Sequence, residues 1–263
     1  MPEGDTVWLT ARRLHQALAG QPLTISDLRI PSLATVDLRG ELVTEVLARG
    51  KHLLTRLSSG NTLHAHLKMD GSWYVTRAGI RAGRLPDHHI RVLLGNSEWL
   101  ATGYRLHDLR LVQTREEAGL VGHLGPDLLG PDWDAAEAVR RLCRQPERSV
   151  AEALLDQGNL AGIGNLYKNE VLFIERVHPW TQLAQVPDPI RLVDTAHRLL
   201  VANREHPEQS TTGLLGRGRQ HWVYERTGQA CLKCRTPIQR AQQGPAQQQR
   251  NSYWCPTCQR PPD

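Results

Sequence analysis

The chain has 263 residues, of which 40% are hydrophobic and 22% charged, and it carries a formal net charge of +5. This composition is that of a globular protein, and the length suffices for two modest domains. It contains no apolar run of the roughly 18–20 residues that a membrane span needs, and its N-terminus lacks the order of a secretory signal. We therefore expect no membrane partner and a cytoplasmic location, whereas the modest basic excess favours a polyanionic partner only weakly.

The first hundred residues predict one helix followed by a β-rich region. From residue 4 to about residue 19 the apolar positions have helical spacing: Val7, Ala11, Leu14 and Leu18. Gly20 follows and is suited to end that helix. From about Leu23 to Gln113 the pattern changes to short alternating runs such as HLLTRL, TLHAHL and SWYVT, separated by turn residues. Such a series predicts an antiparallel sandwich or barrel.

From about Arg115 onward the pattern becomes helical. The segment RSVAEALLDQ opens with Ser149 and has Glu152 three residues later, which is the spacing of a capping box. Two turns rich in Gly and Asn (GNLAGIGN) separate it from a second helix, NLYKNEVLFIERV, and a further helix is expected from about Pro189 to Asn203. Residues 210–220 are rich in Gly, Thr and Arg and are expected to form a mobile loop.

Four of the five cysteines form two CxxC pairs near the C-terminus, Cys231 with Cys234 and Cys255 with Cys258. Twenty residues separate the pairs, a spacing at which four thiolates can close a tetrahedron around one Zn²⁺. The alternative is a pair of disulfides, which a reducing compartment disfavours. We expect one structural zinc ion, because a tail of about 40 residues cannot bury much apolar surface. Cys143 stands apart in a helical segment and is expected to be a buried, inert thiol.

Between the two pairs, the segment QQRNSYW predicts a β-hairpin that carries Arg250 at its tip. A guanidinium on a metal-stapled hairpin is well suited to hold phosphates. The alternative is an ordinary solvent-exposed arginine.

The chain begins Met1-Pro2-Glu3, and removal of Met1 before a small residue would expose the imino nitrogen of Pro2. An amine of this kind, with a pKa of about 8, is partly neutral near pH 7 and can attack an aldehyde-like carbon to form an iminium ion. Glu3 could act beside it as general acid or base. Taken alone the signal is weak, because many proteins begin in this way.

Six segments occur together in one order: MPEGDTVW, RGKHLL, HLKMDGSW, GPDLL, LLDQGNLAGIGNLYKNEVLF and YWCPTCQR. With them the chain resembles the formamidopyrimidine-DNA glycosylase/endonuclease VIII family from end to end, and it is most similar to actinobacterial members of the endonuclease VIII branch. The resemblance implies an α+β fold. It implies a β-sandwich catalytic domain (1–115), a helical domain (120–215) with a helix–two-turn–helix element at about 149–173, and a zinc finger (222–263).

The resemblance also implies a function and a set of site residues. The function is that of a bifunctional DNA glycosylase and abasic-site lyase of base excision repair, which excises oxidised bases, expected to be pyrimidines, and nicks by β- and δ-elimination. Pro2 matches the nucleophile, Glu3 the acid that protonates the sugar ring oxygen, and Lys51 the lysine of β-elimination. Arg250 matches the finger arginine that grips the phosphates beside the lesion, and Asn165 the phosphate contact of the two-turn element. Met69 matches the wedge that fills the gap left by the extruded nucleotide.

The chain departs from the family pattern at three places. Lys68 stands where the family carries a polar DNA contact, and His123 stands where it carries a DNA-contacting arginine. The loop at 102–110 lacks the Pro-Arg-Arg-Phe pattern that would identify the other two void-filling residues, and Arg105 and Leu106 are the candidates for them. This loop is the basis of a hypothesis that the protein prefers bubbles, single strands or abasic sites.

Two other functions stay open. The protein could be an abasic-site lyase with little base excision, or a non-enzymatic zinc protein that binds damaged DNA. In each case the expected partner is damaged double- or single-stranded DNA, and a monomer associated with the bacterial nucleoid is expected.

Overall fold

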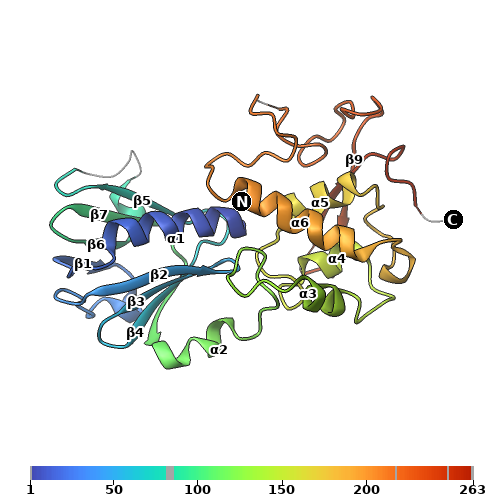
Figure 1. Ribbon diagram of the computed structural model, residues 1–263. Coiled ribbons are helices and arrows are strands. Elements are labelled where there is room, and N and C mark those ends of the chain that lie inside the picture. Colours follow the sequence, from blue (N-terminus) through green and yellow to red (C-terminus); the bar gives the residue numbers. More distant parts are fainter. Residues whose placement is uncertain (1, 81–85, 217, 248, 262–263) are drawn as a thin grey trace. The chain divides into compact units, whose positions relative to one another are not determined.

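The computed structural model describes residues 2–80, 86–216, 218–247 and 249–261. The chain divides into two compact units, Met1–His123 and Leu124–Asp263, and each is described by itself (Figure 1). No helix in the described residues is both long enough and apolar enough to cross a bilayer. The α+β class expected from the sequence is confirmed, since helices and antiparallel sheets occur together.

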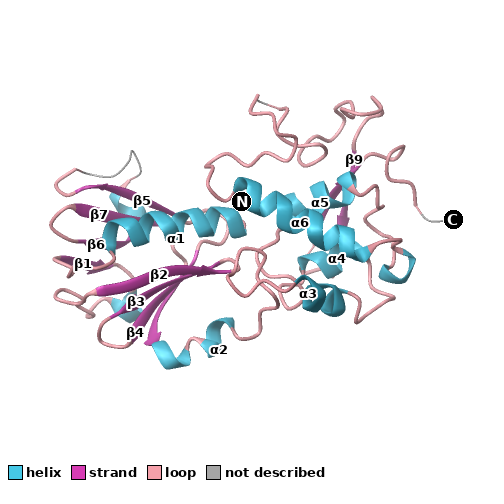
Figure 2. Cartoon of the chain, in the orientation of Figure 1, coloured by secondary structure: helices cyan, strands magenta, loops and turns pink. Residues whose placement is uncertain are grey.

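The N-terminal unit is a sandwich of two four-stranded antiparallel sheets with one long helix, α1 (Gly4–Leu18) (Figure 2). One sheet has the order β1-β6-β7-β5, with bounds Ile25–Leu28, Ile90–Gly95, Trp99–Tyr104 and Ser72–Arg77. The other has the order β2-β3-β4-β8, with bounds Val43–Arg49, His52–Leu57, Asn61–His66 and Asp108–Gln113. Short helical turns occupy Pro31–Leu33, Asp87–His89, Thr114–Glu116 and α2 (Ala118–Val121).

Helix α1 and both sheets share one hydrophobic core. The apolar face of α1 is buried as its spacing predicts, and Leu14 and Leu18 are each only 1% exposed. The inner face of the β2-β3-β4-β8 sheet adds Leu53, Leu63 and Ala65, and along β4 the last two alternate with polar residues. The strand period of two therefore places the polar partners of these residues on the outer face.

The second unit is helical and includes the cysteine-rich tail. Its helices are α3 (Ala135–Leu142), α4 (Val150–Leu155), α5 (Asn165–Ile174) and α6 (Pro189–Asn203), with a short helical turn at Leu183–Gln185. Strands β9 (Gln239–Gln243) and β10 (Arg250–Trp254) pair as the expected hairpin. The tail packs into the same core as the helices, since Cys231, Ile238 and Tyr253 join Phe173 and Leu172 there.

Two local expectations need correction. Helix α4 begins directly after Ser149 as expected, but the Ser149 hydroxyl donates to the Glu152 carboxylate and makes no cap to a helix amide. Cys143 is exposed rather than buried. Helix α3 ends at Leu142, so that Cys143 lies at its C-cap and the buried face of the helix is provided by Ala138 and Leu142.

Candidate active site and nucleic-acid interface

Pro2 and Glu3 lie at the N-terminus of α1. Glu3 is the N-cap residue, and its carbonyl accepts a hydrogen bond from the Val7 amide at 3.0 Å. Pro2 is half-buried, whereas Glu3 is fully buried at 0% exposure, and Asp5 in the first turn is 2% exposed. A helix N-terminus favours negative charge, which supports buried carboxylates here. The first helix thus holds an acid directly beside Pro2.

Lys51 lies in the two-residue turn that joins β2 to β3. Arg49 pairs with His52 across this turn, and Gly50 between them has a φ of 57°, a conformation that glycine adopts without steric cost. Lys51 itself is half-buried. Its charge lies close enough to His66, the last residue of β4, to lower the pKa of that imidazole.

Met69 lies in the short loop after β4 and is 63% exposed, the second most exposed large apolar residue described. The loop is tight, because the Gly71 amide donates to the Leu67 carbonyl at 2.9 Å and a Cβ on Gly71 would lie 2.5 Å from that oxygen. Lys68, at a φ of 52°, pairs with Asp108 at 3.3 Å. The exposure of Met69 fits the expected wedge, whereas the ammonium of Lys68 is drawn towards β8.

The 105–107 loop lies next to the Met69 loop. Asp70 Oδ1 is 3.2 Å from His107 Nε2, and Asp70 Oδ2 is 3.9 Å from Arg105 Nη1. Arg105 has a φ of 50°. Leu106 is 1% exposed and belongs to the N-terminal core. Leu106 therefore does not fit the interpretation that it fills a void in DNA, because its side chain points into the sandwich.

Four histidines gather on the outer face of the β2-β3-β4-β8 sheet. His52 Nδ1 and His64 Nε2 are 2.8 Å apart, and their rings stack at 5.1 Å. His66 meets His52 edge-on at 4.9 Å, and the exposed His123 approaches the same ring at 6.2 Å. Sequence reasoning singled out only His123. The signal was available, since His64 and His66 alternate along one strand and thus share a face.

In this histidine cluster (His52, His64, His66 and His123), the rings of His52, His64 and His66 are held in the neutral form. Burial, with neighbouring His66 and His64, lowers the pKa of His52 to about 3. Burial, together with Lys68 and Lys51, lowers the pKa of His66 to about 4. Burial also lowers the pKa of His64, partly opposed by Asp108. Uncharged rings can pack closely, whereas imidazolium ions would repel each other and the two lysines.

The cluster predicts an acid-labile N-terminal unit. The unfolded chain takes up histidine protons near pH 6.5, but folded His52 and His66 do so only near pH 3 and 4, so stability falls as the pH drops through this interval. The free energy of unfolding falls by at most about 1.4 kcal/mol per pH unit for each histidine. Urea unfolding between pH 7.5 and 5 should therefore show a shallower loss for His52→Gln than for the parent. The exposed His206→Gln should keep the parental slope, and equal slopes for all three proteins would contradict the prediction.

In the second unit, two tight turns join α4 to α5. The side-chain Nε2 of Gln157 donates to the Leu155 and Ile163 carbonyls, each at 2.9 Å, and its Oε1 accepts from the Gly162 backbone amide at 3.1 Å. Helix α5 begins after Gly164, which has no side chain to cap it. A helix N-terminus of this kind favours an anion. The glutamine therefore fixes the turns that present the start of α5.

Asn165, the first residue of α5, is 7% exposed and faces the finger hairpin. Its Nδ2 donates to the Asn251 carbonyl at 3.0 Å, and its Oδ1 has no hydrogen-bond partner among the described residues. Asn169 contacts the same strand, donating to the Asn251 carbonyl at 3.4 Å and accepting from the Tyr253 amide at 2.8 Å. Arg250 at the start of β10 is exposed, and the structure thus brings it to the same strand that Asn165 binds.

Arg250 and Arg148 line one pocket of the second unit, with a volume of about 460 Å³. Glu152, Gln157 and Gln243 also line it. Arg148 is already paired with Asp156 at 2.7 Å. The pocket is lined from α4, the turns and the hairpin, and since Asp156 neutralises Arg148, Arg250 is the guanidinium in its lining that is left for an anionic ligand.

Sequence reasoning missed two buried ionisable residues of α5. Glu170 is 0% exposed and accepts hydrogen bonds from the Trp222, Val223 and Tyr224 amides at 2.7–2.9 Å and from the Thr211 hydroxyl. Lys168 is 1% exposed. A signal was available for Lys168, since Asn165, Lys168 and Asn169 stand at helical spacing and share one face of α5, but that face is buried against β10.

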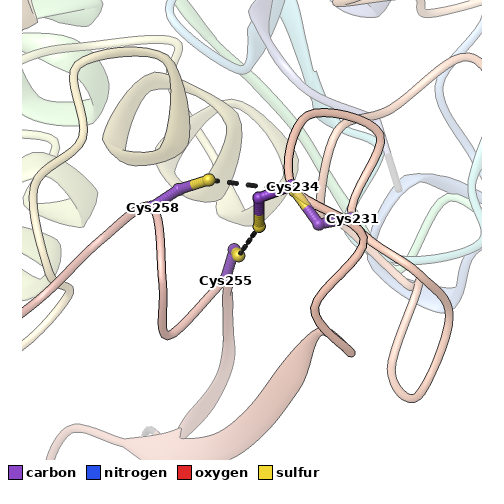
Figure 3. A group of neighbouring side chains, drawn as sticks. All are labelled: Cys231, Cys234, Cys255 and Cys258. Carbon is purple, nitrogen blue, oxygen red and sulfur yellow. Dashed lines mark hydrogen bonds between the residues drawn. The ribbon is translucent and has the colours of Figure 1, made fainter.

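The four paired cysteines converge, as Figure 3 shows. Their sulfur atoms all lie within 4.8 Å of one another, with Cys231 to Cys258 at 3.9 Å and Cys234 to Cys255 at 3.3 Å. Tetrahedral zinc with bonds of about 2.3 Å needs sulfurs about 3.8 Å apart, so the set fits such an ion far better than disulfides of about 2.05 Å. Hydrogen bonds with Thr236 lower the pKa of Cys234 to about 6, whereas burial raises the pKa of Cys255. A divalent cation would favour all four thiolates.

Comparison with known proteins supports this assembly of parts. Residues 1–116 match the formamidopyrimidine-DNA glycosylase N-terminal domain, and residues 124–210 match the formamidopyrimidine-DNA glycosylase H2TH domain. The chain is 53% identical to a probable endonuclease 8 2 of Streptomyces coelicolor, covering 100% of this chain and 95% of that protein. It is 43% identical to the DNA-(apurinic or apyrimidinic site) lyase Nei2 of Mycolicibacterium smegmatis, covering 98% and 99%.

Solved structures show the same fold. The Fpg protein of Lactococcus lactis, in a complex with DNA that contains an abasic site, aligns with a TM-score of 0.79 at 22% identity, covering 98% of this chain and 99% of that one. A complex of wild-type L. lactis Fpg with DNA containing an oxidised pyrimidine also aligns with a TM-score of 0.79 at 22% identity, covering 98% of this chain and 100% of that one. Since both domain types match and relatives at 53% and 43% identity span nearly the whole sequence, the chain belongs to the formamidopyrimidine-DNA glycosylase family.

Proposed function

We propose that the protein is a bifunctional DNA glycosylase and abasic-site lyase of base excision repair, with the imino nitrogen of Pro2 as nucleophile. The observation that carries this proposal is the fully buried Glu3 carboxyl beside Pro2 at the start of α1, in a chain whose relatives are named endonuclease 8 and abasic-site lyase. Met1, whose removal the proposal requires, lies outside the described residues.

The chemistry follows from an amine and an acid at a sugar carbon. The Pro2 nitrogen attacks C1′, the bond from C1′ to the base breaks, and the base leaves with the bonding electron pair and takes up a proton. Glu3 protonates the ring oxygen, so that the ring opens and an iminium ion forms. The iminium acidifies the C2′ proton, which a base removes, and the 3′ phosphate leaves by β-elimination. We assign Lys51 to this proton transfer, and Arg250 to the phosphate that leaves in a second, δ-elimination.

The remaining contacts proposed for DNA are one apolar wedge, two polar contacts, and two residues that bind phosphate. Met69 is the wedge, supported by its 63% exposure. Lys68 and His123 are proposed as polar contacts of the N-terminal unit. Asn165 and Arg250 are proposed to bind phosphate, supported by the start of α5 and by the exposed guanidinium.

We propose that Cys231, Cys234, Cys255 and Cys258 hold one structural Zn²⁺. Four protein ligands leave no position for substrate, so the ion supplies folding free energy rather than catalysis. Its support is the convergence of the four sulfurs (Figure 3).

Borohydride reduction tests the proposal, because it converts an iminium into a stable covalent adduct. We expect the mature protein to be trapped on oligonucleotides bearing thymine glycol, dihydrouracil or an abasic site, with less adduct on 8-oxoguanine, in both duplex and single-stranded form. Adducts on the abasic site alone would favour a lyase with little base excision. Binding without any adduct would make the protein a non-enzymatic damage-binding protein.

A further inference from the structure

A buried lysine joins the finger hairpin to α5. Lys168 Nζ donates to the Ser252 hydroxyl at 2.8 Å and approaches the Asn251 carbonyl at 3.4 Å. Lys168 is 1% exposed and Ser252 is fully buried. An ammonium group removed from water in this way is costly unless its hydrogen bonds are satisfied. The free-energy cost of burying the Lys168 ammonium group suggests that its hydrogen bonds have a specific role.

From Ser252 the hydrogen bonds continue through the hairpin to α4. The Ser252 hydroxyl donates to Gln243 Oε1 at 2.7 Å, and Gln243 Nε2 donates to the Ser149 hydroxyl at 3.0 Å and to the Pro179 carbonyl at 3.0 Å. The Ser149 hydroxyl in turn donates to the Glu152 carboxylate. We call Lys168, Ser252, Gln243, Ser149 and Glu152 the polar chain.

Every donor in the polar chain points the same way, from the ammonium towards the carboxylate. An ammonium can only donate and a carboxylate can only accept, so these two ends fix the orientation of the two hydroxyls and the amide between them. Aligned hydrogen bonds in a low-dielectric interior strengthen one another. The chain therefore behaves as one unit that spans α5, both hairpin strands and the start of α4.

The polar chain passes directly beside Arg250. Gln243 is the register partner of Arg250 across the hairpin, and Ser252 is two residues further along the same strand and on the same face. Gln243, Glu152 and Arg250 also line the same pocket. Asn165 and Asn169 fasten the backbone of β10 at Asn251, whereas the polar chain fixes the side-chain layer from which Arg250 projects.

We propose that Lys168 is a positioning residue, which acts through the polar chain to hold Arg250 where it can grip a DNA phosphate. This inference rests on the proposed function, because it needs Arg250 to bind phosphate. Lys168 itself is buried and touches no DNA. It contributes by holding the hairpin strands in place. Arg250 then loses less conformational entropy when it binds DNA.

A double-mutant cycle with Lys168→Met and Arg250→Gln tests the proposal. Binding to a duplex with a tetrahydrofuran abasic analogue should weaken roughly tenfold for Lys168→Met, which corresponds to the loss of one charge-assisted contact. In the Arg250→Gln background the same substitution should change the dissociation constant less than about twofold, since its effect passes through Arg250. Bound zinc and cooperative urea unfolding should be retained, because Asn165 and Asn169 still hold the strand.

Neighbouring glutamines of β9 give a matched control. Gln243→Leu breaks the polar chain and should weaken binding as Lys168→Met does, whereas Gln242→Leu alters an exposed side chain next to it and should bind like the parent. Additive effects of Lys168→Met and Arg250→Gln would overturn the proposal, as would loss of zinc from Lys168→Met. If Arg250→Gln alone binds like the parent, the phosphate role of Arg250 is wrong, and a persisting defect in Lys168→Met then assigns the lysine to another task.

Discussion

A protein that keeps extra residues in front of Pro2 is expected to form no borohydride-trapped adduct with abasic DNA. In that form the proline nitrogen is an amide, whose lone pair is delocalised into the carbonyl and cannot form an iminium ion. All other residues are unchanged, including the buried Glu3. Adduct formation and strand cleavage are measured by denaturing gel electrophoresis.

The control is the same N-terminally extended protein after a protease has removed the residues in front of Pro2. Cleavage should restore trapping, while binding to the tetrahydrofuran analogue should be similar before and after the cut. Equal strand cleavage by the uncut and the cut protein would show that another nucleophile performs the reaction.

Glu3→Gln should abolish base excision and spare much of the lyase activity. Excision requires an acid that opens the sugar ring, and loss of a general acid costs roughly 10²- to 10⁴-fold in rate. An abasic site already equilibrates with its open aldehyde and needs this help less, so its cleavage should fall by less than about tenfold. Single-turnover rates on a thymine glycol duplex and on an abasic duplex separate the two steps.

Asp5→Asn provides a comparison for Glu3→Gln, because Asp5 is a second buried carboxyl in the first turn of α1. A general loss of structure at the helix start would lower both activities in both variants. If Glu3→Gln slowed excision and abasic cleavage equally, the proposed division of labour would be wrong.

The sequence predicted the architecture wherever a local pattern has one meaning. The apolar period of α1, the alternating runs of the sandwich and the limits of α6 at Pro189 and Asn203 all match the structure. The CxxC pairs predicted a convergence of four sulfurs, which is confirmed. The helical and strand patterns depend on residues near one another in the chain, whereas the two CxxC pairs, 20 residues apart, are linked by the ligand set that a metal site requires.

Features that depend on distant pairing were missed. The histidine cluster arises because the register of β3 and β4 sets His52 opposite His66. The polar chain joins Lys168 to Ser252, 84 residues later, and no sequence period links them. Leu106 was misjudged for the same reason, since only the packed sandwich shows that its side chain is internal. The roles of Pro2, Lys51 and Asn165 stay predictions that rest on family resemblance.

The Glu170 carboxylate has a further consequence for the segment between Thr211 and Trp222, whose two ends it holds. It holds the Thr211 hydroxyl and the amides from Trp222 to Tyr224, and so closes a ring of chain at its base. The contacts with Glu170 are made by Thr211 and by residues 222–224, and none of them uses a residue of the intervening segment 212–221. Exchange of the intervening residues for a segment twice as long would add only about 0.6 kcal/mol of closure entropy. The fold thus tolerates a longer segment at this position with little loss of conformational stability.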